Sequence, residues 1–298
     1  MDLDLDRMLD STRRGQWSVD ELDWEAPLQG AEGLSVRQRR EAGLQLVFTA
    51  GLERQAARVF GLCAQYAADP RARDIYRLFS ADELRHAEAE LRLARRYGVS
   101  WRDLPLATRW AFGVLAANFD QPDRGVHELS SATILLFELA LDTLLVPILD
   151  EVADPVQRAV FQRINQDEAR HLAMDYWLLD RKGAALAAAA AGRDAKTEAA
   201  ARGWARRAFD QYRLVRTMIA FIAAFGAMAV ATPGVRVHFA DGRLIARYLE
   251  RVRRVPRKAP HAMAVPTYRM GLRGQQRLLR LLNLVTNGSV ARAAGRPA

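Results

Sequence analysis

The chain has little of what characterises secreted or membrane proteins. It holds one cysteine, Cys63, among 298 residues, which excludes an internal disulfide. Its first residues are acidic, whereas a secretory signal begins with basic and then apolar residues. Its one long uncharged stretch, residues 217–235, is rich in Ala and Gly, which favours a buried helix over a bilayer span. These absences predict a protein of the reducing cytoplasm.

Acidic residues are scarce at the C-terminal end. From Arg236 onwards the chain has 14 Lys or Arg against Asp241 and Glu250, although the net charge of the whole chain is only +9. A basic segment of this kind attracts an acidic carrier protein, a nucleic acid or an anionic membrane. The alternative interpretation is a solvated face of Arg-rich helices.

Two segments of the chain repeat one motif 85 residues apart. The first copy runs from Asp69-Pro70 through Asp-Glu-Leu-Arg-His at 82–86 to Gly98, and the second runs from Asp154-Pro155 through Asp-Glu-Ala-Arg-His at 167–171 to Gly183. A further glutamate lies 30 residues before each motif glutamate. The repeat therefore supplies four glutamates and two histidines in matching positions, namely Glu53, Glu83, His86, Glu138, Glu168 and His171.

Apolar spacing and capping residues around the repeat predict an all-α protein. Four helices are predicted, at residues 35–66, 69–98, about 127–152 and 154–183. The third is expected to bend near Pro147. The long link at 97–126, with a short helix around Trp110, reads as a crossover connection. We therefore predict a ferritin-like four-helix bundle with one long crossover. The predicted divisions are an extended N-terminal arm (1–34), the bundle (35–183), an Ala-rich helical or flexible spacer (184–203) and a basic helical extension that packs on the bundle (204–298).

The repeated residues have the chemistry of a metal site. Residues three apart share a helix face, so Glu83 points with His86 and Glu168 points with His171. Buried carboxylates need compensation, and two divalent cations would neutralise four of them. Mixed oxygen and nitrogen ligands suit iron or manganese better than structural zinc.

We assign one metal to each half of the repeat and expect at least two of the glutamates to bridge the pair. The first metal takes Glu53, Glu83 and His86, and the second takes Glu138, Glu168 and His171. The aspartate before each motif glutamate can accept a hydrogen bond from a ligand histidine. Crosswise pairing is expected, with Asp82 on His171 and Asp167 on His86.

With these motifs the chain resembles the ferritin-like di-iron carboxylate superfamily over about residues 35–183. The spacing Glu, 28 residues, Asp-Glu-x-x-His looks most like the p-aminobenzoate N-oxygenase family, and Asp-Glu-x-Arg-His is similar to a motif of the soluble acyl carrier protein desaturases. The N-oxygenases have a third histidine one turn before the last glutamate, where this chain has Ile164.

The resemblance implies an O2-dependent oxygenase or oxidase that hydroxylates, desaturates or N-oxidises a small organic or carrier-bound substrate. It implies two iron ions, with manganese or a mixed pair as the alternative, O2 as co-substrate, an external electron donor and a homodimer. Residues one or two turns from the ligands are expected to line the pocket or serve redox chemistry: Thr49, Tyr76, Phe79, Ile134, Asp142 and Ile164.

Two other classes of function stay open at this stage. One is rubrerythrin-like or ferritin-like handling of iron or peroxide. The absence of a Cys-x-x-Cys iron site argues against this class. The other is a basic binding or membrane-associated protein whose metal site is structural.

Overall fold

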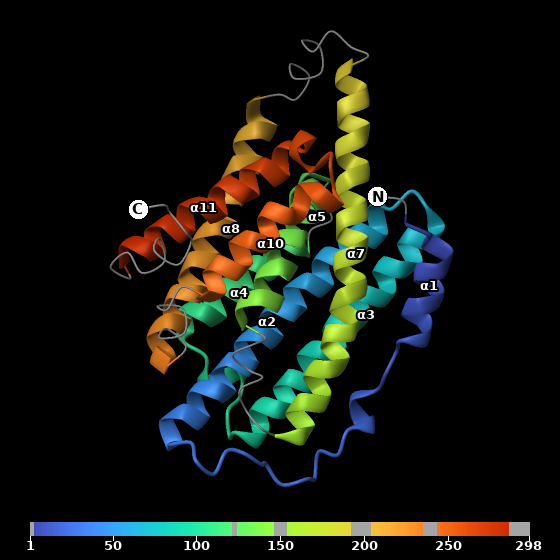
Figure 1. Ribbon diagram of the computed structural model, residues 1–298. Helices are drawn as coiled ribbons and strands as arrows, with labels where there is room; N and C mark the ends of the chain where they lie inside the picture. Colours follow the sequence, from blue (N-terminus) through green and yellow to red (C-terminus); the bar gives the residue numbers. More distant parts are fainter. Residues whose placement is uncertain (1–2, 121–123, 146–153, 192–203, 235–242, 286–298) are drawn as a thin grey trace.

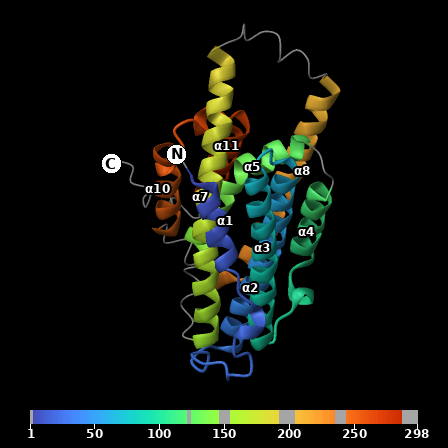
Figure 2. The same ribbon diagram turned by 90° about the vertical axis from the view of Figure 1, so that its right-hand side faces the viewer.

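The fold is a bundle of long helices, seen in a computed structural model that describes residues 3–120, 124–145, 154–191, 204–234 and 243–285 (Figure 1). Within these ranges every regular element is helical, which confirms the predicted class. The helices that carry the repeated residues lie side by side in both views (Figures 1 and 2): α2 (Val36–Tyr66), α3 (Pro70–Arg96), α5 (Arg124–Ala140) and α7 (Pro155–Ala191).

Local sequence signals set the ends of these helices. Ser35 and Gln38 form a capping box at the start of α2, and Asp69 with Pro70 begins α3. Asp154 begins α7 by accepting a hydrogen bond from the Gln157 backbone N–H at 3.0 Å. After α3 the chain turns at Gly98, whose φ of 73° is unfavourable for other residues. These boundaries confirm the predictions for α2 and α3.

The crossover connects α3 to α5 and contains the helix predicted around Trp110. It comprises η2 (Trp101–Asp103) and α4 (Leu106–Phe119). Beside α4 lies α8 (Trp204–Ala231), joined to it by a 2.9 Å hydrogen bond from Asn118 to Thr217. The uncharged segment at 217–235 was predicted to be a buried helix. This prediction is wrong for one face, because α8 buries one side and exposes apolar residues on the other.

The sequence predicted an extended N-terminal arm, but part of this arm is helical. It contains α1 (Leu5–Arg14), capped by Asp4, and the short η1 (Val19–Glu21). Because Leu5 and Leu9 lie four residues apart, both reach the apolar core shared with α2, α3 and α7. The motif-based prediction missed this helix because it is short and has only three apolar residues, Leu5, Met8 and Leu9.

The C-terminal extension forms part of the core. It consists of α10 (Arg243–Lys258), η4 (Ala262–Ala264) and α11 (Pro266–Val285). Buried residues such as Val255 and Tyr268 pack with Leu135 and Leu136 of α5. Within the described residues, no helix is both long and apolar enough to cross a membrane.

Helix α7 continues to Ala191, so the prediction that it ends at Gly183 is wrong. Gly183 serves packing instead: a Cβ there would lie 2.0 Å from the backbone oxygen of His261. The first residues of the Ala-rich spacer, 184–191, are therefore helical, while 192–203 lie outside the described residues. The predicted bend near Pro147 also lies outside them. Just before it, α5 passes into a π-helix, η3 (Leu141–Leu145).

Candidate metal centre

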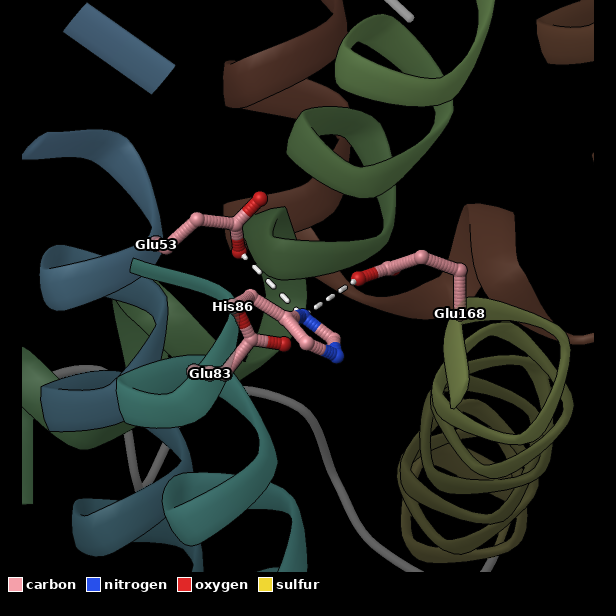
Figure 3. Close-up of side chains that lie close together, drawn as sticks. All are labelled: Glu53, Glu83, His86 and Glu168. Atoms are coloured by element: carbon pink, nitrogen blue, oxygen red, sulfur yellow. Dashed lines mark ion pairs between the residues drawn. The ribbon is translucent and has the colours of Figure 1, made fainter. Parts of the chain in front are cut away.

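The six repeated side chains converge inside the bundle from four different helices. The ring nitrogen Nδ1 of His86 lies 3.8 Å from Glu53 Oε2 and 3.5 Å from Glu168 Oε1. Figure 3 marks these two pairs with dashed lines. In the other half, Nδ1 of His171 lies 2.8 Å from Glu83 Oε1 and 3.6 Å from Glu168 Oε1. The centres of the two imidazole rings are 6.0 Å apart.

These side chains form two overlapping groups of candidate metal ligands. In each group the ligand atoms all lie within 4.8 Å of one another. One group adds Glu53 and His86 to the shared pair of Glu83 and Glu168, and the other adds Glu138 and His171 to that same pair. The two shared glutamates therefore lie where carboxylates could bridge two ions. The structure assigns Glu83 and Glu168 to this place, one from each copy of the repeat.

Burial makes the arrangement costly without compensating charge. Glu83, His86 and His171 are 0% exposed, and the least buried of the six, Glu168, is only 7% exposed. Among the described residues, no contact to either carboxylate oxygen of Glu83 or to Nδ1 of the two histidines has hydrogen-bond geometry, although these atoms crowd one another. An unpaired buried charge costs several kcal/mol, so these atoms are suited to ligating cations.

The same charges shift the pKa values of the site. Burial, with the charges of Glu53 and Glu168 added to it, holds the pKa of Glu83 well above its usual range. For His171 burial lowers the pKa, but the charge of Glu168 and the contact with Asp82 outweigh it and raise the pKa to about 10. Without cations the site therefore holds protons, and metal ions must displace them to bind.

The aspartates pair crosswise with the histidines of the opposite copy. The Nε2 atom of His86 lies 2.9 Å from Asp167 Oδ2, and the Nε2 atom of His171 lies 3.4 Å from Asp82 Oδ2. Each aspartate also accepts a hydrogen bond from the arginine three residues later, Arg170 or Arg85. Both imidazoles are thus held from outside with Nδ1 turned toward the carboxylates.

The N-terminal segment completes this outer layer, and sequence reasoning missed it. Gln16 donates a hydrogen bond to Asp82 at 2.8 Å, and Trp17 donates one from its indole to Asp167 at 2.9 Å. The Trp17 ring also lies nearly parallel to the His86 ring, at 6.4 Å between centroids. Adjacent residues of one segment therefore hold the two aspartates, which belong to opposite halves of the site.

A second pair of buried acids extends the repeat. Glu90 and Asp175 each lie four residues after a motif histidine and are 2% and 1% exposed. Neither oxygen of Asp175 has a hydrogen-bond partner among the residues that the structure describes, and burial raises its pKa to about 8. The 85-residue register could have revealed this pair, because the two acids occupy matching positions.

The predicted pocket residues have diverse surroundings. Phe79 packs against His171 with 4.2 Å between ring centroids, and the hydroxyl of Thr49 bonds to the backbone of its own helix. Tyr76 is buried against Phe60, and burial raises its pKa well above the usual range. The remaining three differ as well: Ile134 and Ile164 are buried in apolar clusters, whereas Asp142 pairs with Arg251 of α10.

Comparison with known proteins supports the fold. No protein-family model matches this chain, and no curated protein matches it in sequence. Among solved structures, it is similar to the dimanganese(II) protein NrdF of Streptococcus sanguinis, with a TM-score of 0.55 and 10% identity. The match covers 90% of this chain and 94% of NrdF. The architecture is thus the ferritin-like bundle that the sequence predicted.

Proposed function

We propose that this protein is an O2-dependent non-haem di-iron oxygenase or oxidase. The observation that carries the proposal is the pair of overlapping ligand groups that share Glu83 and Glu168. Six protein ligands for two ions leave coordination positions open, which distinguishes a reactive site from a closed structural one. A pair of ferrous ions, when bound, would supply electrons to O2.

The protein's own residues would bind, orient and shield. Glu53 with His86 would hold one ion and Glu138 with His171 the other, and Glu83 and Glu168, which belong to both ligand groups, would be available to both. Apolar side chains around the site, including Phe79 and Ile164, are buried and would exclude water. Asp175, whose pKa is about 8, would hold a proton near the site at neutral pH.

Oxygen and nitrogen donors of this kind leave iron and manganese as the choices, and a mixed pair is consistent with the same set. Iron is the proposal because the repeat resembles di-iron oxygenases. The NrdF structure holds manganese, so a dimanganese site is the alternative to test. Metal analysis of the protein purified from cells grown with both metals would decide between them.

We propose a small organic substrate, delivered by an acidic carrier protein, and an external electron donor. Exposed arginines on α10 and α11, among them Arg253 and Arg273, offer the carrier a basic surface. Binding of an acidic carrier should then weaken as salt rises. Equal binding of a neutral protein would refute this part of the proposal.

The experiment is to load the metal-free protein anaerobically with ferrous iron and then add O2. The proposal predicts two ferrous ions per chain and one rapid reaction with O2 that stops unless an electron donor is added. Oxidation of many ferrous ions per chain would indicate iron storage instead. A loaded protein that does not react with O2 would indicate a structural site. The control is His127→Ala, because His127 stacks on Tyr66 rather than joining the six ligands.

A further inference from the structure

Large apolar side chains gather on the outside of α8 and α4. In the described parts of the chain thirteen such side chains are exposed, and eight of them belong to these two helices. On α8 the exposed fractions are 59% for Tyr212, 55% for Val215, 52% for Ile219 and 47% for Ile222. Figure 2 shows both helices on the flank of the bundle opposite α10. A helix at a solvated surface needs only one apolar face, so this second face of α8 requires a partner.

The inner face of α8 is already used by the bundle. Ala220, Ala224 and Met228 recur at every fourth residue and are fully or nearly fully buried. The outer residues recur at alternating intervals of three and four, the spacing by which two helices pack along a seam. Between Thr217 and Thr232 the helix has no charged residue, so a charged partner would find no complement there.

Two glycines on this flank have open space beside them in the described part of the chain. A Cβ added at Gly226 of α8 or at Gly113 of α4 would meet nothing within 4 Å. Glycine in a helix costs about 1 kcal/mol relative to alanine, and packing among the described residues does not explain these positions. Close approach of a helix from another molecule would explain them.

We propose that the outer face of α8, flanked by α4, is the interface through which two copies of this chain pair. The large and small residues of α8 fit an antiparallel, two-fold symmetric seam centred between residues 220 and 221. In that register Ile219 faces Ile222 of the partner copy, and two exposed residues of the N-terminal half each face a small residue of the C-terminal half. Val215 then faces Gly226, and Tyr212 faces Ala229. An isologous interface requires such self-complementarity.

The size of the face suits a dimer. The seam from Tyr212 to Val230 is roughly 27 Å long at 1.5 Å per residue, and two helices are about 20 Å wide. A pair would then bury roughly 1,100 Å², just above the 1,000 Å² or so expected of a specific interface. The proposal does not rest on the enzymatic activity, because the metal ligands lie inside the bundle.

Sedimentation of the full-length protein tests the interface. The wild type should sediment as a dimer at micromolar concentration, and Ile219→Glu should raise the dissociation constant at least 100-fold without changing metal content or helicity. Leu186→Glu is the matched control, because Leu186 is an exposed apolar residue on α7, away from this flank, and should leave the dimer intact. A monomeric wild type, or an Ile219→Glu variant that still dimerises as wild type does, would overturn the proposal.

Cross-linking tests the register independently of variant stability. Chains with Tyr212→Cys and chains with Ala229→Cys should form a disulfide-linked pair when mixed and oxidised, whereas neither should cross-link with itself. The native Cys63 is buried and gives the background in the wild type. Self-linking of either variant would indicate parallel helices and refute the register. Binding of wild type, but not Ile219→Glu, to neutral phospholipid vesicles without dimer formation would show that the face meets lipid instead.

Discussion

Replacing Trp17 with phenylalanine should weaken one metal of the pair more than the other. Trp17 donates its indole N–H to Asp167 Oδ2 at 2.9 Å, and the same oxygen meets His86 Nε2 at 2.9 Å. Phenylalanine keeps most of the apolar contact but removes the donor. Asp167 then holds His86 less firmly, and the half of the site that includes Glu53 is affected first.

The magnitude follows from the contact that is lost. A hydrogen bond to a charged acceptor contributes about 1.5–3 kcal/mol. Removing an outer partner of a metal ligand lowers metal affinity about 10–100-fold, which corresponds to about 1.4–2.7 kcal/mol. We therefore expect one of two binding constants to fall by that factor and the other to change less than about threefold, because His171 is held by Asp82, which in turn accepts a hydrogen bond from Gln16.

Manganese(II) is a suitable probe for the assay, since its free ion is counted directly by electron paramagnetic resonance during titration of the metal-free protein. Trp24→Phe is the control: Trp24 belongs to the same segment but donates its indole N–H to the backbone of Val19 at 2.7 Å. Unchanged constants for Trp17→Phe, or an equal loss in Trp24→Phe, would refute the positioning role of Trp17.

Two further predictions concern stability. Gly183→Ala should lower the melting temperature by several degrees, because the added Cβ would meet the backbone of His261. The control, Gly61→Ala, should not lower it, because its Cβ would meet only Ser80 Oγ, at 3.9 Å. Equal effects of the two substitutions would contradict the packing of η4 on α7. The raised pKa of Asp175 predicts that the contribution of this residue to the stability of the metal-free protein is fully present below about pH 4 and is lost as pH approaches 8, at up to about 1.4 kcal/mol per unit. Asp175→Asn should flatten this dependence in denaturant titrations, and an unaltered slope would show that Asp175 ionises normally.

Features encoded locally could be predicted from the sequence. The caps at Ser35 and Asp69 act on backbone groups within three residues, so their positions fix where α2 and α3 begin. The six candidate ligands could be found because spacing of three places Glu83 beside His86 on one face, and the repeat applies the same rule to Glu168 and His171.

Features that depend on distant contacts could not be predicted. Gln16 lies 66 residues from Asp82, and Trp17 lies 150 residues from Asp167, so no local pattern connects them. Gly183 has the sequence context of a helix end, yet the approach of His261 gives it a packing role inside α7. The π-helix after Glu138 is likewise contacted from far along the chain, since Arg251 of α10 donates a hydrogen bond to Thr143 at 2.9 Å.

The most direct test of the central claim is metal stoichiometry measured by mass spectrometry of the native protein loaded with ferrous iron or manganese. The account predicts two ions per chain in the wild type and in His127→Ala. It predicts one or none in Glu138→Ala and in His171→Ala, with helicity retained, because both residues belong to the same ligand group and neither belongs to the other. Full occupancy by two ions in both site variants would contradict the proposed centre.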